Sequence, residues 1–242
     1  MAIVFEEAST IASVVHWDIY ANYPSTVNAN DILICKIGQN ITGQSWSTGV
    51  SGWVEIYDAS WGCVYYKRAT GSESGTAKFT STKSNVQSAV IYRFSGCITT
   101  GTPYEQNANR AALDNNVDIP DLAGDTTGPN RLVIATVQIT DDLYSNTGAT
   151  NYTSQDEQVS SVNLGSANHL WTVAQAAAGR PGADSYGIEL TGYDDMTINV
   201  MALIPVPAAG GGYANDVNTV GTAAIGKING VATADIGKVN TA

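Results

Sequence analysis

Arg131-Leu-Val-Ile-Ala-Thr-Val-Gln-Ile139 is the stretch of this 242-residue chain that decides its fold, because its β-branched residues favour an extended, buried strand. It is the longest of a series of apolar runs separated by turn-forming residues. Shorter runs of the same kind are Asp31–Ile37, Gly52–Tyr57, Cys63–Lys67, Thr76–Thr80, Ser88–Phe94, His169–Ala174, Ser185–Leu190 and Met196–Ile204. Roughly nine or ten strands without a sustained helical period predict an all-β fold of the β-sandwich class.

The composition is typical of many short strands joined by polar turns. Only 14% of the residues are charged, whereas the chain has 24 glycines and is rich in Ser, Thr, Asn and Ala. Its length is sufficient for one large all-β domain or two small ones. The net charge of −11 argues against nucleic acid and anionic membrane surfaces as partners, because their phosphates would be repelled. Its main expected effect is to keep the protein soluble.

Cysteine usage and the ends of the chain bear on the compartment in which it folds. Cys35, Cys63 and Cys97 are far apart, lie in apolar stretches and form no CxxC pair. We therefore expect buried reduced thiols, with one disulfide as the alternative. The first residues lack the positive and apolar regions of a signal peptide, and Val200–Val206 is too short to span a bilayer. These features predict folding in a cytosol.

Two proline- and glycine-containing stretches predict how the chain is organised. Pro205-Val-Pro207 ends the last strand, because proline cannot continue a β-ladder, and Gly210-Gly-Gly212 follows as a flexible joint. The predicted parts are a sandwich over 1–207, a joint over 208–212 and an arm over 213–242. Residues 100–130, rich in Asn, Asp, Pro and Gly, are predicted to form a long loop with little regular structure.

The arm contains an internal repeat. Asn218-Thr-Val-Gly-Thr-Ala-Ala-Ile-Gly-Lys-Ile228 is followed by Asn229-Gly-Val-Ala-Thr-Ala-Asp-Ile-Gly-Lys-Val239, and seven of the eleven aligned positions are identical. A period of eleven permits a right-handed coiled coil. However, each glycine costs about 1 kcal/mol in a helix interior, and Asn229-Gly230 is a strong turn signal. Short strands or extended segments separated by turns are therefore favoured over helices.

So short a repeat cannot bury its apolar side alone and must stack on copies of itself or on a partner. Three-fold assembly of the chain is the favoured arrangement, with the apolar positions of the repeat packed against symmetry mates. The predicted assembly residues are Val220, Ile225, Ile228, Val231, Ile236 and Val239.

The middle of the chain resembles a group of tailed-bacteriophage virion structural proteins with a concanavalin-like jelly-roll domain. The resemblance rests on four stretches and on the C-terminal Ile-Gly-Lys-Ile-Asn-Gly-Val motif, which is similar to tail repeats of such proteins. The four stretches are Asp31-Ile-Leu-Ile, Ser51-Gly52-Trp53, Tyr65-Tyr66-Lys67-Arg68-Ala-Thr-Gly-Ser-Glu-Ser-Gly75 and Ala89-Val-Ile-Tyr-Arg-Phe-Ser-Gly96.

This resemblance implies a jelly-roll β-sandwich and a structural role on a phage particle, as a tail fibre, baseplate attachment or head decoration. It implies other virion proteins as partners, assembly in the host cytoplasm and a final location on the virion surface. It supplies no catalytic residues and no cofactor. A carbohydrate-binding adhesin that recognises a glycan on the host surface is the alternative, and a glycan hydrolase is a third possibility.

The sequence shows no constellation typical of an enzyme. The two histidines, His16 and His169, are not accompanied by a nucleophile elbow, and no Cys/His set has zinc-binding spacing. Asp114-Asn-Asn116-Val-Asp118 begins like a calcium loop but lacks the glycine turn and the final glutamate. Asp141-Asp142 and Asp194-Asp195 are paired acids without evidence of glycosidase spacing. We expect no enzymatic activity, no cofactor and no metal.

Aromatic residues provide the one candidate for ligand contact. Trp46, Trp53, Trp61, Tyr57, Tyr65 and Tyr66 cluster in a short window. Alternation along strands must send some of these rings into the core. Trp46 lies in the polar stretch Gly43-Gln-Ser-Trp-Ser-Thr-Gly49 and is therefore the predicted exposed residue for a glycan.

Overall fold

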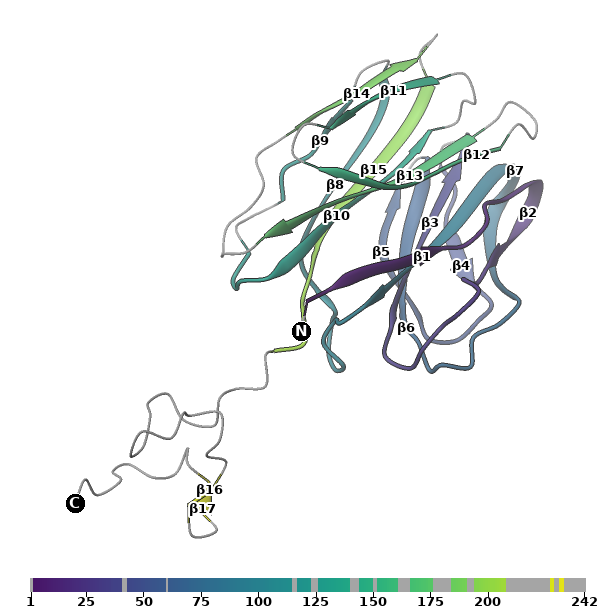
Figure 1. The fold of residues 1–242 in the computed structure, drawn as a ribbon. Coiled ribbons are helices and arrows are strands. Elements are labelled where there is room, and N and C mark those ends of the chain that lie inside the picture. Colours follow the sequence, from purple (N-terminus) through teal and green to yellow (C-terminus); the bar gives the residue numbers. More distant parts are fainter. Residues whose placement is uncertain are drawn as a thin grey trace. The chain divides into compact units, whose positions relative to one another are not determined.

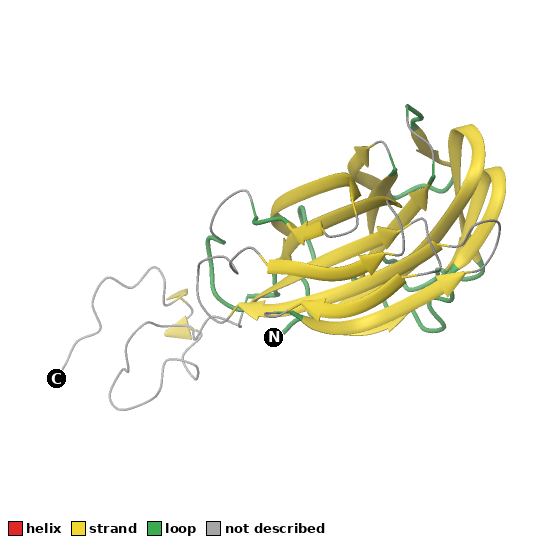
Figure 2. Cartoon of the chain, turned by 90° about the horizontal axis from the view of Figure 1, so that it is seen from above, coloured by secondary structure: helices red, strands yellow, loops and turns green. Residues whose placement is uncertain are grey.

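A computed structural model of the protein describes residues 2–40, 43–59, 61–114, 117–122, 126–139, 144–149, 152–160, 166–175, 184–190, 194–207, 227–228 and 231–232. All regular elements in these ranges are strands (Figure 2), which confirms the predicted all-β fold. The described residues accordingly contain no helix that is long and apolar enough to cross a membrane.

The first sheet is built from strands that follow one another in the sequence. They are β1 (Val4–Ala8), β2 (Ala12–Asn22), β3 (Ile32–Gln39), β4 (Trp46–Thr48), β5 (Trp53–Ala59), β6 (Gly62–Arg68) and β7 (Thr76–Ser95). The order is β1-β7-β3-β6-β5, with β2 and β4 also paired to β7, and each pair is antiparallel. The 20-residue strand β7 therefore organises this sheet.

The later strands form a second sheet and a smaller third one. The second sheet contains β8 (Tyr104–Asp114), β10 (Arg131–Ile139), β12 (Thr153–Ser160), β13 (Ser166–Gln175) and β15 (Asp194–Leu203), in the order β12-β13-β10-β15-β8. The third contains β9 (Val117–Ile119), β11 (Tyr144–Ala149) and β14 (Asp184–Leu190), in the order β11-β14-β9. The decisive run Arg131–Ile139 is the central strand of its sheet, and its residues 133–139 are buried. Figure 1 shows the arrangement of these sheets.

The first two sheets pack face to face and form a β-sandwich. Their facing side chains make one apolar cluster, to which alternate residues of β3, β7, β10 and β15 contribute, as expected from the two-residue period of a strand. Its fully buried members include Ile32, Ile34, Val90, Tyr92, Phe94, Ile134, Leu170, Met201 and Leu203. The outer face of the second sheet is apolar too, and Ile119 of β9 packs against it.

The outer face of the first sheet is covered by part of the same sheet, because β7 bends back on itself. The ring centroid of Phe79 lies 5.2 Å from that of Tyr65 in β6. Tyr65 and Ile91 are both paired with Cys35 of β3, so they occupy the same position along the sheet. Phe79, which contacts Tyr65, therefore lies near that position too, although it is twelve residues before Ile91 in the same strand. The bend is at residues 81–85 of β7, and β2 bends with it. Between the pairs His16–Asn85 and Asp18–Thr80, the single residue Trp17 of β2 lies opposite four residues of β7.

A band of polar side chains crosses the interior of the sandwich near the bend. Asn168 Nδ2 donates to Ser88 Oγ at 3.0 Å, which links the two sheets, and Thr197 Oγ1 donates to Gln138 Oε1 at 3.1 Å. Lys36 of β3 is also completely buried, and this burial lowers its pKa to about 7. The core is therefore apolar toward one end and polar toward the other.

Three sequence predictions about strands are wrong or incomplete. Thr76–Thr80 and Ser88–Phe94 belong to the single bent strand β7, because the polar residues between them continue the pairing with β2. Residues 100–130 are not a structureless loop, since β8 pairs along its whole length with β15 and β9 pairs with β14. The first 29 residues, for which no strand was predicted, contain β1 and β2.

The chain divides into a unit Ala2–Val206, which holds the three sheets, and a unit that includes Pro207–Ala242. In the latter, the described residues form β16 (Lys227–Ile228) and β17 (Val231–Ala232), an antiparallel pair in which Ile228 is opposite Val231. This pair brackets the predicted Asn229-Gly230 turn. The remaining predicted assembly residues, Val220, Ile225, Ile236 and Val239, lie outside the described residues. Their role in assembly stays a prediction.

Candidate functional site

The sandwich has two chemically different ends, between which β3 and the second half of β7 run in opposite directions. At one end Ile32 is paired with Phe94, and at the other Gln39 is paired with Gln87. The first is here termed the exit end, because the chain leaves the sandwich there after Val206. The second is termed the bend end, because β7 turns back there. Figure 1 shows β2 and β7 turning together at the edge remote from the N mark.

At the exit end, residues from both ends of the sandwich unit lie close to Gly96. Val206 N donates to Gly96 O at 2.8 Å, and Ile98 N donates to Ile204 O at 2.9 Å. Gly96 has φ 76°, and a Cβ at this position would stand 2.2 Å from Ala2 O. Only glycine satisfies both the left-handed backbone and this close approach.

A buried ion pair lies in the same region. Arg93 Nη1 is 3.0 Å from Asp31 Oδ2, and the exposed fractions of the two side chains are 9% and 6%. Asp31 Oδ2 also accepts the amide of Asn28 at 2.9 Å, and Asp31 O accepts the amide of Ala69 at 2.8 Å. Three of the four stretches that carry the phage resemblance therefore meet at Asp31, since Ala69 and Arg93 belong to the other two.

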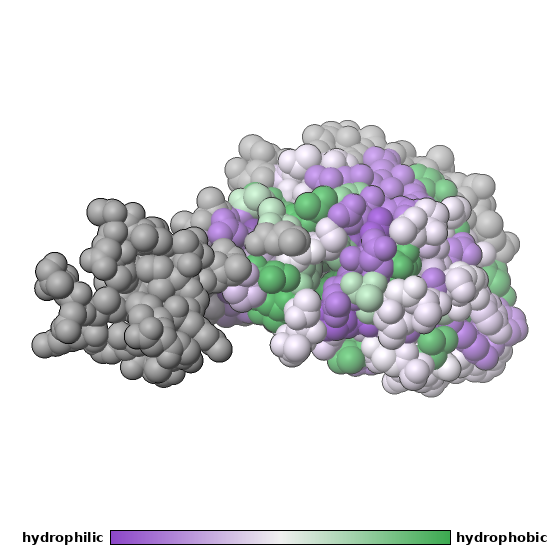
Figure 3. All heavy atoms as spheres, turned by 60° about the horizontal axis from the view of Figure 1, so that its bottom comes forward, coloured by the Kyte–Doolittle hydropathy of each residue, from purple (hydrophilic) through white to green (hydrophobic). Residues whose placement is uncertain are grey.

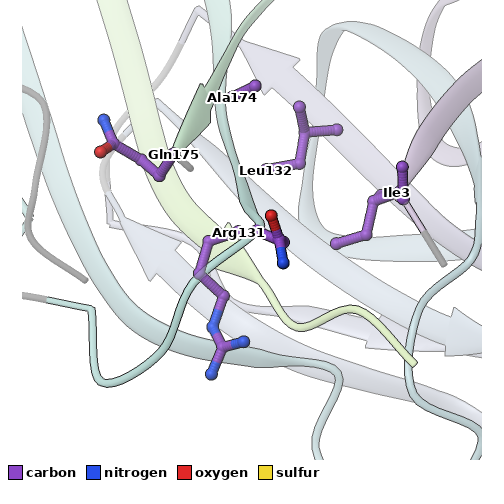
Figure 4. Close-up of a pocket in the computed structure, with 7 residues that line it drawn as sticks. Ile3, Arg131, Leu132, Ala174 and Gln175 are labelled. Carbon is purple, nitrogen blue, oxygen red and sulfur yellow. The ribbon is translucent and has the colours of Figure 1, made fainter. Parts of the chain in front are cut away.

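A crevice of about 160 Å³ opens beside the exit end. In Figure 4 the apolar side chains of Ile3 and Leu132 lie on one side of it, and the polar side chains of Arg131 and Gln175 lie on the other. Arg131 Nε is 2.6 Å from Glu105 Oε1, so its charge is neutralised. Burial raises the pKa of Glu105, but hydrogen bonds from Arg131 and Thr127 outweigh it and hold the pKa below its ordinary value. The crevice thus lacks an unpaired catalytic group among the described residues that line it.

A larger groove of about 290 Å³ follows the bent strand β2 at the bend end. It is termed the β2 groove and is lined by Ala12, Ser13, Val14, His16, Asp18, Ile19 and Tyr20. Asp18 Oδ2 lies 2.8 Å from Lys78 Nζ, and Asp18 Oδ1 accepts a hydrogen bond from Thr80 Oγ1 at 2.7 Å. The bond from Lys78, followed by that from Thr80, lowers the pKa of Asp18. The groove therefore contains an ionised and well-oriented carboxylate at neutral pH.

Two large aromatic side chains are exposed on the same strand. Trp17 is 50% exposed and Tyr20 is 52% exposed, and Lys78 Nζ lies 6.0 Å from the Tyr20 ring centroid. Val15 beside them is 47% exposed. On the face seen in Figure 3, the described hydrophobic residues form patches between hydrophilic ones. Of the six large hydrophobic residues that are exposed in the described part of the chain, three lie on β2, namely Val15, Trp17 and Tyr20, so this strand is a candidate contact surface.

Trp46, the predicted glycan contact, is buried. Its side chain is only 6% exposed, because β4 pairs with Ser81–Phe79 of β7 and directs the indole into the cluster on the outer face of the first sheet. Trp53 and Tyr65 belong to the same cluster. The signal used for Trp46, a tryptophan among polar residues, also marks Trp17 between His16 and Asp18, and there it identifies an exposed ring.

The two histidines lie in different environments. His16 is exposed, and its Nδ1 accepts the backbone amide of Asp18 at 3.0 Å. His169 is buried, and this burial lowers its pKa to about 4, although Glu157 opposes the shift. A neutral, buried His169 is a core residue.

The acidic candidates lie only partly within the described residues. Among the described residues, no three His, Cys, Asp or Glu side chains are grouped so as to hold a metal ion. Asp114 ends β8 and Asp118 lies in β9, but Asn116 and the paired acids Asp141-Asp142 lie outside the described residues. Asp194 and Asp195 are the first residues of β15, and only their backbone belongs to the described part of the structure.

The cysteines follow the prediction. Cys35, Cys63 and Cys97 are all buried and free, so the reduced-thiol interpretation is confirmed and the disulfide alternative is not.

Comparisons of the chain with protein-family models, with curated proteins and with solved structures find no match.

Proposed function

We propose that the chain is a non-enzymatic structural protein of a tailed-phage particle, which displays its β-sandwich on the virion surface and is anchored by the repeat arm. The jelly-roll connection pattern is part of this proposal and comes from the resemblance. The observed face-to-face antiparallel sheets support the broader sandwich class.

One observation carries the proposal. Asp31, Ala69 and Arg93, which belong to three separate stretches of the phage resemblance, are joined by direct contacts at the exit end. The carbonyl oxygen of Gly96, which ends the stretch Ala89–Gly96, accepts a hydrogen bond from the amide of Val206, the last residue of the sandwich unit. The shared motifs thus stabilise the point from which the arm departs. A stable departure point for the arm supports the role of a module that is displayed and held through that arm.

The arm supports the same proposal, because its pattern is unsuited to a self-contained domain. Ile228 and Val231 are opposite each other in a two-stranded ladder, and such a hairpin is marginally stable by itself. We therefore expect it to be stabilised by neighbouring copies, with a trimer as the favoured state.

The test compares the full chain with a variant that lacks residues 213–242. Sedimentation velocity should give a trimer for the full chain and a folded monomer for the truncated one. On particles purified from the producing host, labelling should detect the full chain on the surface, and its position should distinguish head from tail. Incorporation of the truncated chain at full occupancy would contradict the anchoring role, and absence of the full chain from particles would contradict the virion role.

A further inference from the structure

We propose that the β2 groove, together with the exposed rings of Trp17 and Tyr20, is a binding site for a neutral saccharide chain. The site is built from residues of the sandwich alone. It does not depend on whether the chain is a virion protein.

The exposed rings are the first argument. Trp17 and Tyr20 leave half of their surfaces in water, at 50% and 52%, although both lie on a strand whose alternate residues Ile19 and Ala21 are fully buried. Exposing two such rings within four residues of one strand forgoes hydrophobic stabilisation, and exposed apolar surface that gathers on one element marks an interaction site. Flat aromatic faces match the C–H faces of pyranose rings, which are themselves flat and weakly apolar.

The polar groups of the groove are the second argument. The Asp18 carboxylate is held by Lys78 and Thr80 and keeps further acceptor capacity for sugar hydroxyl groups. Since His16 Nδ1 accepts the Asp18 amide, Nε2 is the ring nitrogen that can donate a hydrogen bond. A donor and an acceptor beside an aromatic platform are the usual means by which a protein orients a polyhydroxylated ligand.

Charge selects among possible occupants. Lys78, the cation that contacts Asp18 of the groove, is paired with it at 2.8 Å, and the chain carries a net charge of −11. Phosphate, sulfate or sialic acid would therefore meet net repulsion. A neutral saccharide takes hydrogen bonds from the same groups without an electrostatic penalty.

The strand geometry holds the site in place. His16 is paired with Asn85 and Asp18 with Thr80, so Trp17 is fixed on both sides although it has no partner in the register of β7. A ligand platform that is rigid before binding loses less conformational entropy when the ligand is bound. The bend of β7 thus presents the rings, and it does so at the end remote from the arm's departure point.

The experiment uses the full chain on an array that carries neutral gluco-, manno- and galacto-oligosaccharides, with sialylated and phosphorylated glycans as acidic probes. Binding to a neutral oligosaccharide is expected, and calorimetric titration with the strongest neutral binder then measures affinity. Trp17→Ala and Tyr20→Ala should each weaken binding about ten-fold or more, by analogy with the loss of stacking on other ring-shaped ligands. Val54→Ala, which removes a similarly exposed apolar residue from β5, should leave the affinity unchanged.

Several outcomes would overturn the proposal. These are the absence of neutral glycan binding, binding restricted to acidic glycans, or binding that survives both aromatic substitutions while circular dichroism shows a folded protein. Self-association that Trp17→Ala abolishes, without glycan binding, would assign the patch to a second copy of the chain and also overturn it. Trp17→Ala should still join particles and retain the oligomeric state of the full chain, so failure here is distinguishable from failure of the anchoring role.

Discussion

Gln138 of β10 lies against Gly38 of β3 so closely that a Cβ on residue 38 would stand 2.0 Å from Gln138 Cδ. The two residues belong to different sheets, and Gln138 is completely buried and bonded to Thr197. The absence of a side chain at position 38 therefore sets how closely the sheets approach near the bend end. Glycine is needed here for space and not for an unusual backbone angle.

Gly38→Ala should consequently destabilise the sandwich. The added methyl group displaces Gln138 from its bond with Thr197, and overpacking of this kind typically costs about 1–3 kcal/mol. Urea unfolding followed by tryptophan fluorescence measures the change. Gly49→Ala is the control, because a Cβ there meets only Lys78 carbon atoms at 3.7–3.9 Å. Adding Gln138→Ala to Gly38→Ala should recover part of the loss, and no recovery would contradict the proposed contact.

Lys36 predicts an unusual dependence of stability on pH. Burial lowers its pKa from 10.5 to about 7, so between these values the unfolded chain binds a proton that the folded chain does not. The free energy of unfolding should therefore rise as the pH increases from 7 toward 10.5, and below pH 7 this contribution should be constant. Urea unfolding at pH 7, 8 and 9 measures the trend.

The matched variant for this prediction is Lys36→Met, which keeps a long side chain and removes the titrating amine. Its stability at pH 7 should exceed that of the parent chain, because an uncharged methionine is not penalised by burial. The difference between variant and parent should shrink as the pH rises from 7 to 9. A constant difference would show that the Lys36 pKa is not lowered in the folded state.

Arg93 and Asp31 predict a large effect from breaking a buried ion pair. Asp31→Asn removes the anion and leaves the buried Arg93 guanidinium without its partner, which typically costs about 3–5 kcal/mol. The double variant Asp31→Asn, Arg93→Met should be less destabilised than Asp31→Asn alone. Lys78→Met, which breaks the more exposed pair with Asp18, is the comparison and should destabilise the protein much less, because solvent screens an exposed ion pair. Equal losses from the two single variants would contradict the burial argument.

The strands that the sequence predicts most plainly are buried on both faces. Residues 133–139 of β10 and the whole of β3 are buried, so their runs of β-branched residues are uninterrupted and easy to identify. β8 was missed because it is an edge strand that pairs only with β15, and its sequence contains Asn, Arg and Ala in place of β-branched residues. Local propensity cannot reveal a strand that is held chiefly by its partner.

The candidate site depends even more on long-range structure. Trp46 and Trp17 are both tryptophans between polar residues, and the bend in β7 decides their exposure. The bend brings β4 over the first sheet and buries Trp46, while it leaves Trp17 outside the pairing register. Nothing in the polar stretch Ser81–Asn85 distinguishes a bend within one strand from a turn between two. The exposed and buried rings could therefore not be told apart from sequence alone.

The three cysteines provide a final prediction about the integrity of the core. Burial raises the thiol pKa of Cys35 and Cys63 well above its ordinary value and that of Cys97 to about 12. Because the thiolate is the reactive form and all three side chains are inaccessible, the folded chain should not react with Ellman's reagent at pH 8. In denaturant all three should react, and the rate at low denaturant should follow the population of opened molecules. Rapid reaction of one thiol in the absence of denaturant would show that the strand carrying it is accessible, and single Cys→Ser variants would identify which of the three it is.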